Sequence, residues 1–275
     1  FLKNIFSRLV YPKTIAMPST PLHQFLKYEK EYPNDIFLRQ PFSGHWKEWS
    51  WKQAADECRR MASALKALNL PEKTHIAILS KNCAHWMMAD IAIMMAGCVS
   101  IPIYPTLTAA SIQPILEHSD AKAIFIGKLD DFASQENGIP SNLIRIGFDD
   151  YERKEKHSWN DLVQRSVPLT EVYNWTADEI MTIIYTSGTT GKPKGAVHTH
   201  CGFPVKAAQD MAFGTDVHGW SSSPSTFAQG VPRPDVIYWM TDMGWMMGPW
   251  QVFGSLLLGA TMFIYDGAPD FPAPN

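Results

Sequence analysis

The chain has 275 residues, enough for one large or two modest domains. Its residues are 45% hydrophobic and 19% charged, an ordinary balance for a globular protein, which excludes wholesale disorder. The formal net charge of -3 provides no strongly basic face, so nucleic acid is not expected as a partner. No apolar run approaches the roughly 18 residues of a membrane-spanning helix. We therefore expect a cytoplasmic protein.

The first half of the chain alternates between short β-prone runs and helical patterns. Ser50 is predicted as the N-cap of a helix whose apolar residues, from Trp51 to Leu68, recur at steps of three and four. The other predicted elements are, in order, a helix at Leu22–Glu31, strands at Ile36–Arg39 and Trp46–Trp49, a strand at His75–Leu79, a helix at Trp86–Ala96, a strand at Val99–Tyr104, a helix at Ser111–His118 and a strand at Ala121–Ile126. This alternation predicts an α/β fold with doubly wound, mixed or parallel sheets and flanking helices.

The second half gives a less regular pattern. Residues 128–160 are polar and are predicted to be irregular, apart from the apolar run Leu143–Ile146. Gly219–Arg233 is rich in Ser and Pro, which predicts a surface loop. The predicted elements are a helix at Trp159–Gln164, a strand at Ile180–Tyr185, a helix at Cys201–Phe213, a strand at Val236–Thr241, a helix at Trp250–Leu258 and a strand at Ala260–Tyr265.

Directly after the strand at Ile180–Tyr185 comes a loop whose composition suits phosphate binding. Its ten residues comprise four hydroxyl residues, three glycines, two lysines and one proline: Thr186, Ser187, Gly188, Thr189, Thr190, Gly191, Lys192, Pro193, Lys194 and Gly195. Glycines allow the backbone to approach an anion, hydroxyl and amide groups donate hydrogen bonds, and lysines supply positive charge. Only two residues separate Gly188 from Gly191, and Pro193 follows Lys192, so the loop is neither a Walker A nor a dinucleotide-binding motif.

Tyr185–Gly195 resembles the signature of the adenylate-forming (AMP-binding) superfamily, which includes acyl-CoA synthetases, luciferases and peptide-synthetase adenylation domains. Two upstream segments, Asn82–Asp90 and Ser100–Ala109, are similar to long-chain acyl-CoA synthetases. Two downstream segments, Ile237–Trp245 and Gly259–Met262, are similar to short- and medium-chain acyl-CoA synthetases. Together these similarities cover most of residues 20–270.

The resemblance implies ATP-dependent activation of a carboxylic acid, expected to be a fatty acid, to acyl-adenylate and then acyl-CoA, with ATP, Mg²⁺ and coenzyme A required. It implies that Thr186, Ser187, Thr189, Thr190 and Lys192 hold the β- and γ-phosphates, with Gly188, Gly191 and Lys194 completing the loop. It also places Trp245, Met246 and Met247 in the wall of an acyl pocket, although ordinary core is an alternative. His198 and His200 are expected to be structural, hydrogen-bonded residues rather than substrate ligands.

Several departures from the family limit this reading. The family's adenine, ribose, hinge and catalytic-lysine motifs would lie beyond Asn275, so we expect a lead-in at residues 1–20 and an incomplete large N-terminal domain at 21–275, without the small C-terminal domain. The fragment alone is expected to be inactive. The alternatives are a non-catalytic nucleotide- or acyl-binding remnant, or a chimera, because the two halves resemble different branches. Gly219–Arg233 has no counterpart in the family and is either an insertion or an error in the reading of the gene.

Two further features are the opening segment and the cysteines. The opening ten residues combine apolar side chains at near-helical spacing with two basic residues, which leaves peripheral membrane contact open. The four cysteines, Cys58, Cys83, Cys98 and Cys201, form no CxxC pair and are expected to be buried free thiols. The sequence shows no metal-ligand spacing, so no metal site is expected within the chain itself.

Overall fold

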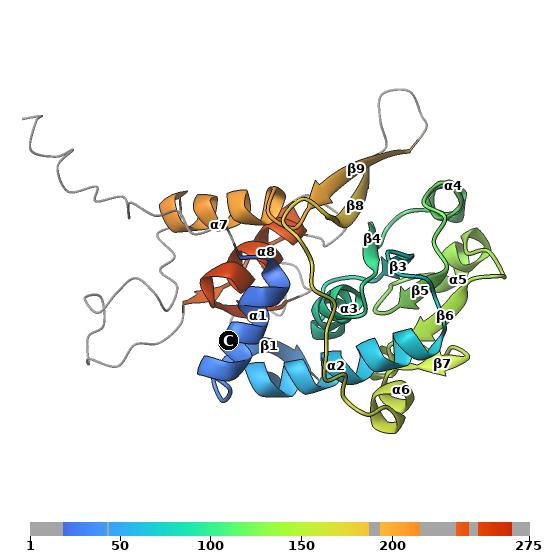
Figure 1. Ribbon diagram of the computed structural model, residues 1–275. Helices are drawn as coiled ribbons and strands as arrows, with labels where there is room; N and C mark the ends of the chain where they lie inside the picture. The colour runs from blue at the N-terminus through green and yellow to red at the C-terminus, as the bar shows by residue number, and fades with distance from the viewer. Residues whose placement is uncertain (1–18, 43, 187–192, 215–234, 242–246, 266–275) are drawn as a thin grey trace, which may run out of the picture.

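The computed structural model describes residues 19–42, 44–186, 193–214, 235–241 and 247–265, which form two sheets with flanking helices (Figure 1). In one sheet the strands lie in the order β7 (His157–Ser158), β6 (Ile144–Gly147), β5 (Ala123–Ile126), β3 (His75–Leu79), β4 (Val99–Ile103), β8 (Ile180–Thr186) and β9 (Lys194–Thr199). In the other the order is β10 (Val236–Ile237), β11 (Thr261–Phe263), β1 (Ile36–Phe42) and β2 (His45–Ser50). The helices are α1 (Pro21–Glu31), α2 (Trp51–Ala67), α3 (Ala84–Met95), α4 (Ala109–His118), α5 (Phe132–Gln135), α6 (Trp159–Arg165), α7 (Phe203–Gly214) and α8 (Met247–Leu258).

Most neighbouring strands of the larger sheet are parallel, and helices connect them. β3 pairs in parallel with β4 and β5, β5 with β6, β6 with β7, and β4 with β8, whereas β8 and β9 are antiparallel. The mixed α/β architecture with flanking helices is therefore confirmed. Parallel strands place their carboxyl ends at one edge of a sheet, the edge where open α/β folds bind ligands.

Helix α3 forms the centre of the core. All of its side chains are buried, which accounts for the apolar run in the sequence. It packs against β3 and β4 of the larger sheet, against β1 of the smaller one, and against α1 and α2. Gly97 follows it with a φ of 79°, a left-handed conformation that favours glycine and ends the helix.

Helix α2 begins at the predicted cap. The Oγ of Ser50 accepts a hydrogen bond from the backbone N–H of Gln53 at 3.2 Å, and the Gln53 side chain accepts one from the Ser50 N–H at 2.9 Å. This reciprocal capping box satisfies two N–H groups at the helix start. The apolar stripe is buried from Trp51 through Leu65. Hydrophobic burial of this stripe fixes the helix against α3.

Two expectations about secondary structure were wrong, and one strand was missed. Residues 128–160 are not irregular throughout, since they contain β6, β7 and α5. The predicted strand Val236–Thr241 is reduced to β10, and Met240 beyond it is 64% exposed. The strand β9 was not predicted, because its alternate residues Ala196 and His198 do not separate cleanly into a buried and an exposed face. Gly219–Arg233 lies outside the described residues.

The described helices include none that is long and apolar enough to cross a bilayer. Residues 1–18, on which the expectation of peripheral membrane contact rests, lie outside the described part of the chain. Cys58, Cys83 and Cys98 are buried free thiols, as predicted, whereas Cys201 is free but only partly buried. Within the described ranges, no group of three or more His, Cys, Asp or Glu side chains could hold a metal ion.

Candidate functional site

The predicted phosphate loop joins β8 to β9. Tyr185 pairs with Gly195 and Thr186 with Lys194 at the base of this hairpin, and the side chains of Thr186 and Lys194 are exposed. The other predicted phosphate ligands, Ser187, Gly188, Thr189, Thr190, Gly191 and Lys192, lie outside the described residues. The loop therefore starts at the carboxyl end of a parallel strand, beside β4, where open α/β sheets bind ligands.

Gly195, the last glycine of the motif, lies where neighbouring side chains leave little room for a Cβ atom. A Cβ atom there would lie 2.8 Å from the Ile183 Cγ2 and 3.3 Å from the Tyr185 Cζ. The first distance is shorter than a real Cβ atom shows and the second is tight, so a side chain at residue 195 would force Ile183 to shift. Tyr185 thus covers the opposite arm of the hairpin as well as leading into the loop.

Lysines also follow two neighbouring strands at the same edge. Lys81 comes two residues after β3, and Lys128 comes two residues after β5. The backbone N–H of Lys81 donates to the carbonyl of Lys128 at 2.8 Å, and the Lys128 N–H donates to the Oγ of Ser80 at 2.9 Å. The sequence analysis did not single these lysines out. Their position after parallel strands was the available signal, but it has meaning only once the strand order is known.

The two histidines after the loop differ in their surroundings. His198, on β9, is partly buried, its pKa is lowered by burial, and its ring lies 5.0 Å from that of Phe203. His200 is fully buried and stacks on Trp175 at 4.5 Å, and burial lowers its pKa to about 4. Neither ring nitrogen of His200 has a hydrogen-bond partner within the described residues. His200 is thus an interior residue, as expected, but it is not hydrogen-bonded through its ring.

The predicted acyl-pocket residues are only partly described. Trp245 and Met246 lie outside the described residues, and Met247 is the first residue of α8. Met247 packs against a small cluster formed by Ala207, Met211, Trp250 and Ala260. This packing agrees with the alternative that Met247 belongs to ordinary core.

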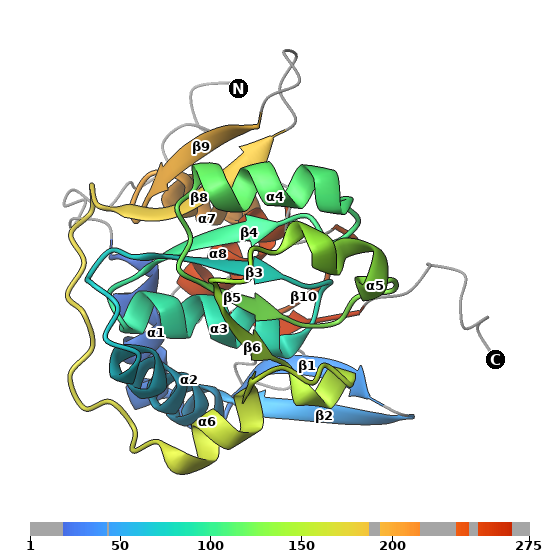
Figure 2. The ribbon, with the colours of Figure 1, turned by 90° about the vertical axis from the view of Figure 1, so that its right-hand side faces the viewer.

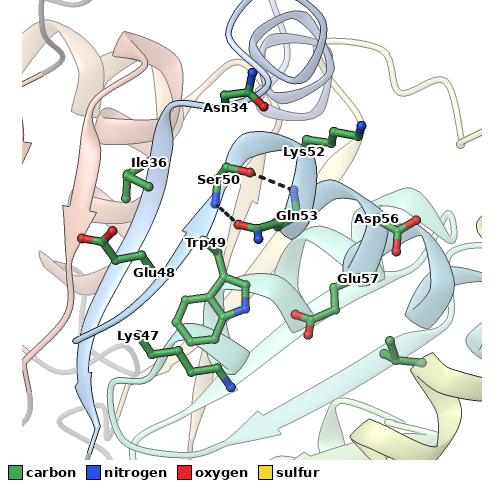
Figure 3. Close-up of a pocket in the computed structure, with 11 residues that line it drawn as sticks. Asn34, Ile36, Lys47, Glu48, Trp49, Ser50, Lys52, Gln53, Asp56 and Glu57 are labelled. Atoms are coloured by element: carbon green, nitrogen blue, oxygen red, sulfur yellow. Dashed lines mark hydrogen bonds between the residues drawn. The ribbon is translucent and has the colours of Figure 1, made fainter. Parts of the chain in front are cut away.

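A separate pocket of about 910 Å³ lies against β2, α2 and α6 (Figure 3). Strand order puts β7 at the sheet edge opposite β8 and β9, and α6 follows β7 directly, so this pocket is remote from the phosphate loop. Its Lys47 forms a 2.7 Å ion pair with Asp150 and lies 4.8 Å from the ring of Trp49. The carboxyl group of Glu57 points toward the Trp49 indole, and burial raises its pKa to about 7.

Comparison with known proteins identifies the family. A model of the AMP-binding enzyme family matches residues 25–275, on both sides of the phosphate loop. The chain belongs to this family. Both halves are members of it, and the match extends over both sheets, not only the loop.

The relatives and solved structures that resemble the chain include CoA synthetases. Acetyl-coenzyme A synthetase of Methanothrix thermoacetophila is 27% identical over 255 residues, covering 86% of this chain and 36% of the relative. Hexanoyl-CoA synthase of Cannabis sativa is 32% identical over 226 residues, which cover 75% of this chain and 29% of the relative. The structure of acetoacetyl-CoA synthetase from Streptomyces lividans superimposes with a TM-score of 0.78 and 21% sequence identity. The superposition covers 92% of this chain and 39% of the synthetase chain. The chain thus spans about a third of the length of the curated relatives named here.

Proposed function

We propose that the protein takes part in the ATP-dependent activation of a carboxylic acid, and that residues 185–195 hold the nucleotide's phosphates. The observation that carries the proposal is the family match across residues 25–275 together with the loop's place at the carboxyl end of β8. The relatives' names, acetyl-coenzyme A synthetase and hexanoyl-CoA synthase, support a CoA ligase and differ in the acid. A fatty acid is the substrate class we propose.

The proposed chemistry has two steps. A carboxylate oxygen attacks the α-phosphorus of ATP, the bond to the bridging oxygen breaks, and acyl-adenylate and pyrophosphate result. The sulfur of coenzyme A then attacks the acyl carbon, which releases AMP and the thiol proton and gives acyl-CoA. Mg²⁺ enters with the nucleotide and neutralises phosphate charge. Positioning and charge neutralisation are the protein's main contributions to such a reaction.

The loop residues would act on the β- and γ-phosphates. The hydroxyl groups of Thr186, Ser187, Thr189 and Thr190 would donate hydrogen bonds, the amides of Gly188 and Gly191 would approach the oxygens closely, and Lys192 would supply charge. Lys194 is exposed at the start of β9, where it can contribute charge from the other arm. These roles favour release of pyrophosphate, because charge develops on the leaving group.

The chain alone is proposed to bind Mg·ATP without sustaining turnover. The test is isothermal titration of Mg·ATP into the 275-residue chain, with carboxylate-dependent ATP–pyrophosphate exchange measured on the same samples. Replacing Thr189 and Lys192 together with Ala should weaken binding by roughly tenfold or more, because each lost charge-assisted contact is worth about 1.5–3 kcal/mol. Lys206→Ala, which removes an exposed lysine from α7, is the matched control and should change little.

The outcomes separate the alternatives. Binding that survives the double substitution contradicts the phosphate-loop assignment. Binding without exchange supports a nucleotide-binding portion of a synthetase or a non-catalytic remnant, whereas substantial exchange by the chain alone shows that it is catalytic. Met247→Gly offers a separate test of the acyl pocket in any active form: a wider pocket should favour longer acids, and unchanged preference places Met247 in the core.

A further inference from the structure

We propose that His118, at the end of α4, is a positioning residue that holds the phosphate loop in place through the hydroxyl group of Tyr185. The two residues are 67 positions apart in the sequence and meet only because the fold brings α4 beside the β8–β9 hairpin (Figure 2). The inference rests on the proposed function, since it concerns the binding of nucleotide phosphates by the loop that Tyr185 introduces.

The contact between the two side chains has the geometry of a good hydrogen bond. The Nδ1 of His118 and the hydroxyl oxygen of Tyr185 are 2.8 Å apart. The rings meet edge to face, with centroids 5.7 Å apart, so the bond is supported by ring packing. Burial raises the pKa of Tyr185, so its phenol stays protonated and can donate to the Nδ1 of a neutral imidazole.

Besides this contact, β8 meets the rest of the sheet through β4, and Tyr185 packs against the edge of the main core. Among the described residues, β4 and β8 share one register pair, Ser100 with Thr182, where the Thr182 hydroxyl donates to the Ser100 carbonyl at 3.1 Å. From Tyr185 onward the register pairs of β8 are with β9 alone. The His118 contact therefore links the outer end of the hairpin to the body of the sheet layer, one residue before Thr186 begins the phosphate loop.

Tyr185 can transmit this constraint to both arms of the loop. Its backbone belongs to β8, and its ring lies over Gly195 of β9, where a Cβ would be 3.3 Å from Cζ. Fixing the ring with His118 thus ties both strands to the end of α4, β8 through its backbone and β9 through the ring's contact at Gly195. A loop held in its binding geometry loses less conformational entropy when the ligand arrives, so affinity is higher.

The experiment is a double-mutant cycle on the binding of Mg·ATP to the 275-residue chain. The variants are His118→Ala, Tyr185→Phe and their combination, with His118→Asn as the conservative replacement, because the asparagine amide takes the place of Nδ1. Gln113→Ala is the matched control, since Gln113 is exposed on the same helix and bonds only to Glu117 among the described contacts. Urea unfolding of each variant without ligand measures the purely structural effect.

We expect each single substitution to weaken Mg·ATP binding by roughly three- to tenfold, the usual worth of one hydrogen bond. The double variant should bind Mg·ATP with the same affinity as the single variant that binds it less tightly, because both substitutions remove the same interaction. His118→Asn should restore most of the affinity, and Gln113→Ala should leave it unchanged. Every variant should still be fully folded in the absence of urea and ligand, so that unfolding does not account for the loss of affinity.

Three results would overturn the inference. Unchanged affinity in His118→Ala would show that the contact does not position the loop. Losses that add in the double variant would show that the two side chains act independently. A variant that is partly unfolded in the absence of urea would show a merely structural role. If the unsubstituted chain fails to bind Mg·ATP, the proposed function fails first and the inference falls with it, which the wild-type titration alone reveals.

Discussion

Glu57 gives the chain a predictable dependence of stability on pH. Its side chain is partly buried, and one carboxylate oxygen is sealed from solvent without a hydrogen-bond partner among the described residues. Burial, with smaller contributions from the charges of Asp150 and Asp56, raises the pKa of this carboxyl, Lys47 and a hydrogen bond from Trp49 oppose the rise, and the net pKa is about 7 instead of 4.5. The protonated form is therefore favoured in the folded state.

The sign follows from proton binding in the two states. Between pH 4.5 and about 7 the folded chain keeps the Glu57 proton that the unfolded chain has released. The stabilisation is complete below pH 4.5 and is lost as the pH rises through 7. A pKa raised from 4.5 to about 7 corresponds to roughly 3 kcal/mol, because each tenfold change in protonation is worth about 1.4 kcal/mol.

Replacing Glu57 with Gln keeps the shape of the side chain but removes its ionisation, so stability no longer falls as the pH rises. We expect Glu57→Gln and the wild type to have similar free energies of unfolding near pH 4.5, and the variant to become more stable by roughly 2–3 kcal/mol at pH 8. Urea unfolding followed by tryptophan fluorescence at several pH values measures the difference. Glu117→Gln, which replaces an exposed glutamate on α4 that does not act on Glu57, is the control. A difference that is constant with pH, or that shrinks as the pH rises, refutes the reasoning.

Three further substitutions test the packing, the cap and the second buried group. Gly195→Ala should lower the free energy of unfolding by about 1–3 kcal/mol through overpacking in the hairpin, whereas Gly214→Ala, with open space around it, should not; thermal unfolding distinguishes them. Ser50→Ala should cost about 0.5–2 kcal/mol in urea unfolding, and Thr108→Ala, at a cap whose side chain bonds to no backbone N–H of the helix, should cost much less. Burial lowers the pKa of His85 from 6.5 to about 4, so the free energy of unfolding falls as the pH drops from 6.5 towards 4. His85→Phe should make the free energy of unfolding less dependent on pH in this range, and an unchanged dependence would contradict the assignment to His85.

The elements with a strong local signal could be predicted from the sequence. The stripe of α2 and its Ser50 cap, the strand β3 and the apolar helix α3 all depend on periodicity or on capping within a few residues. By contrast, β6 has only four residues, and its strand character depends on pairing with β5, from which 17 residues separate it. Short strands of this kind are decided by tertiary pairing, so a local pattern does not find them.

The candidate site likewise contains residues that the local sequence reveals and residues that only the fold reveals. The loop signature could be found because its chemistry is concentrated in consecutive residues, and the strand before it could be found because it is an apolar run. The contact between His118 and Tyr185 could not, because nothing near His118 distinguishes it from any exposed histidine at the end of a helix. It acquires a role only from the strand order, in which β8 is inserted beside β4 and the connection through α4 passes near the hairpin. The residues that perform the chemistry can be recognised as a motif, whereas those that hold the motif in position are chosen by topology and must be found in three dimensions.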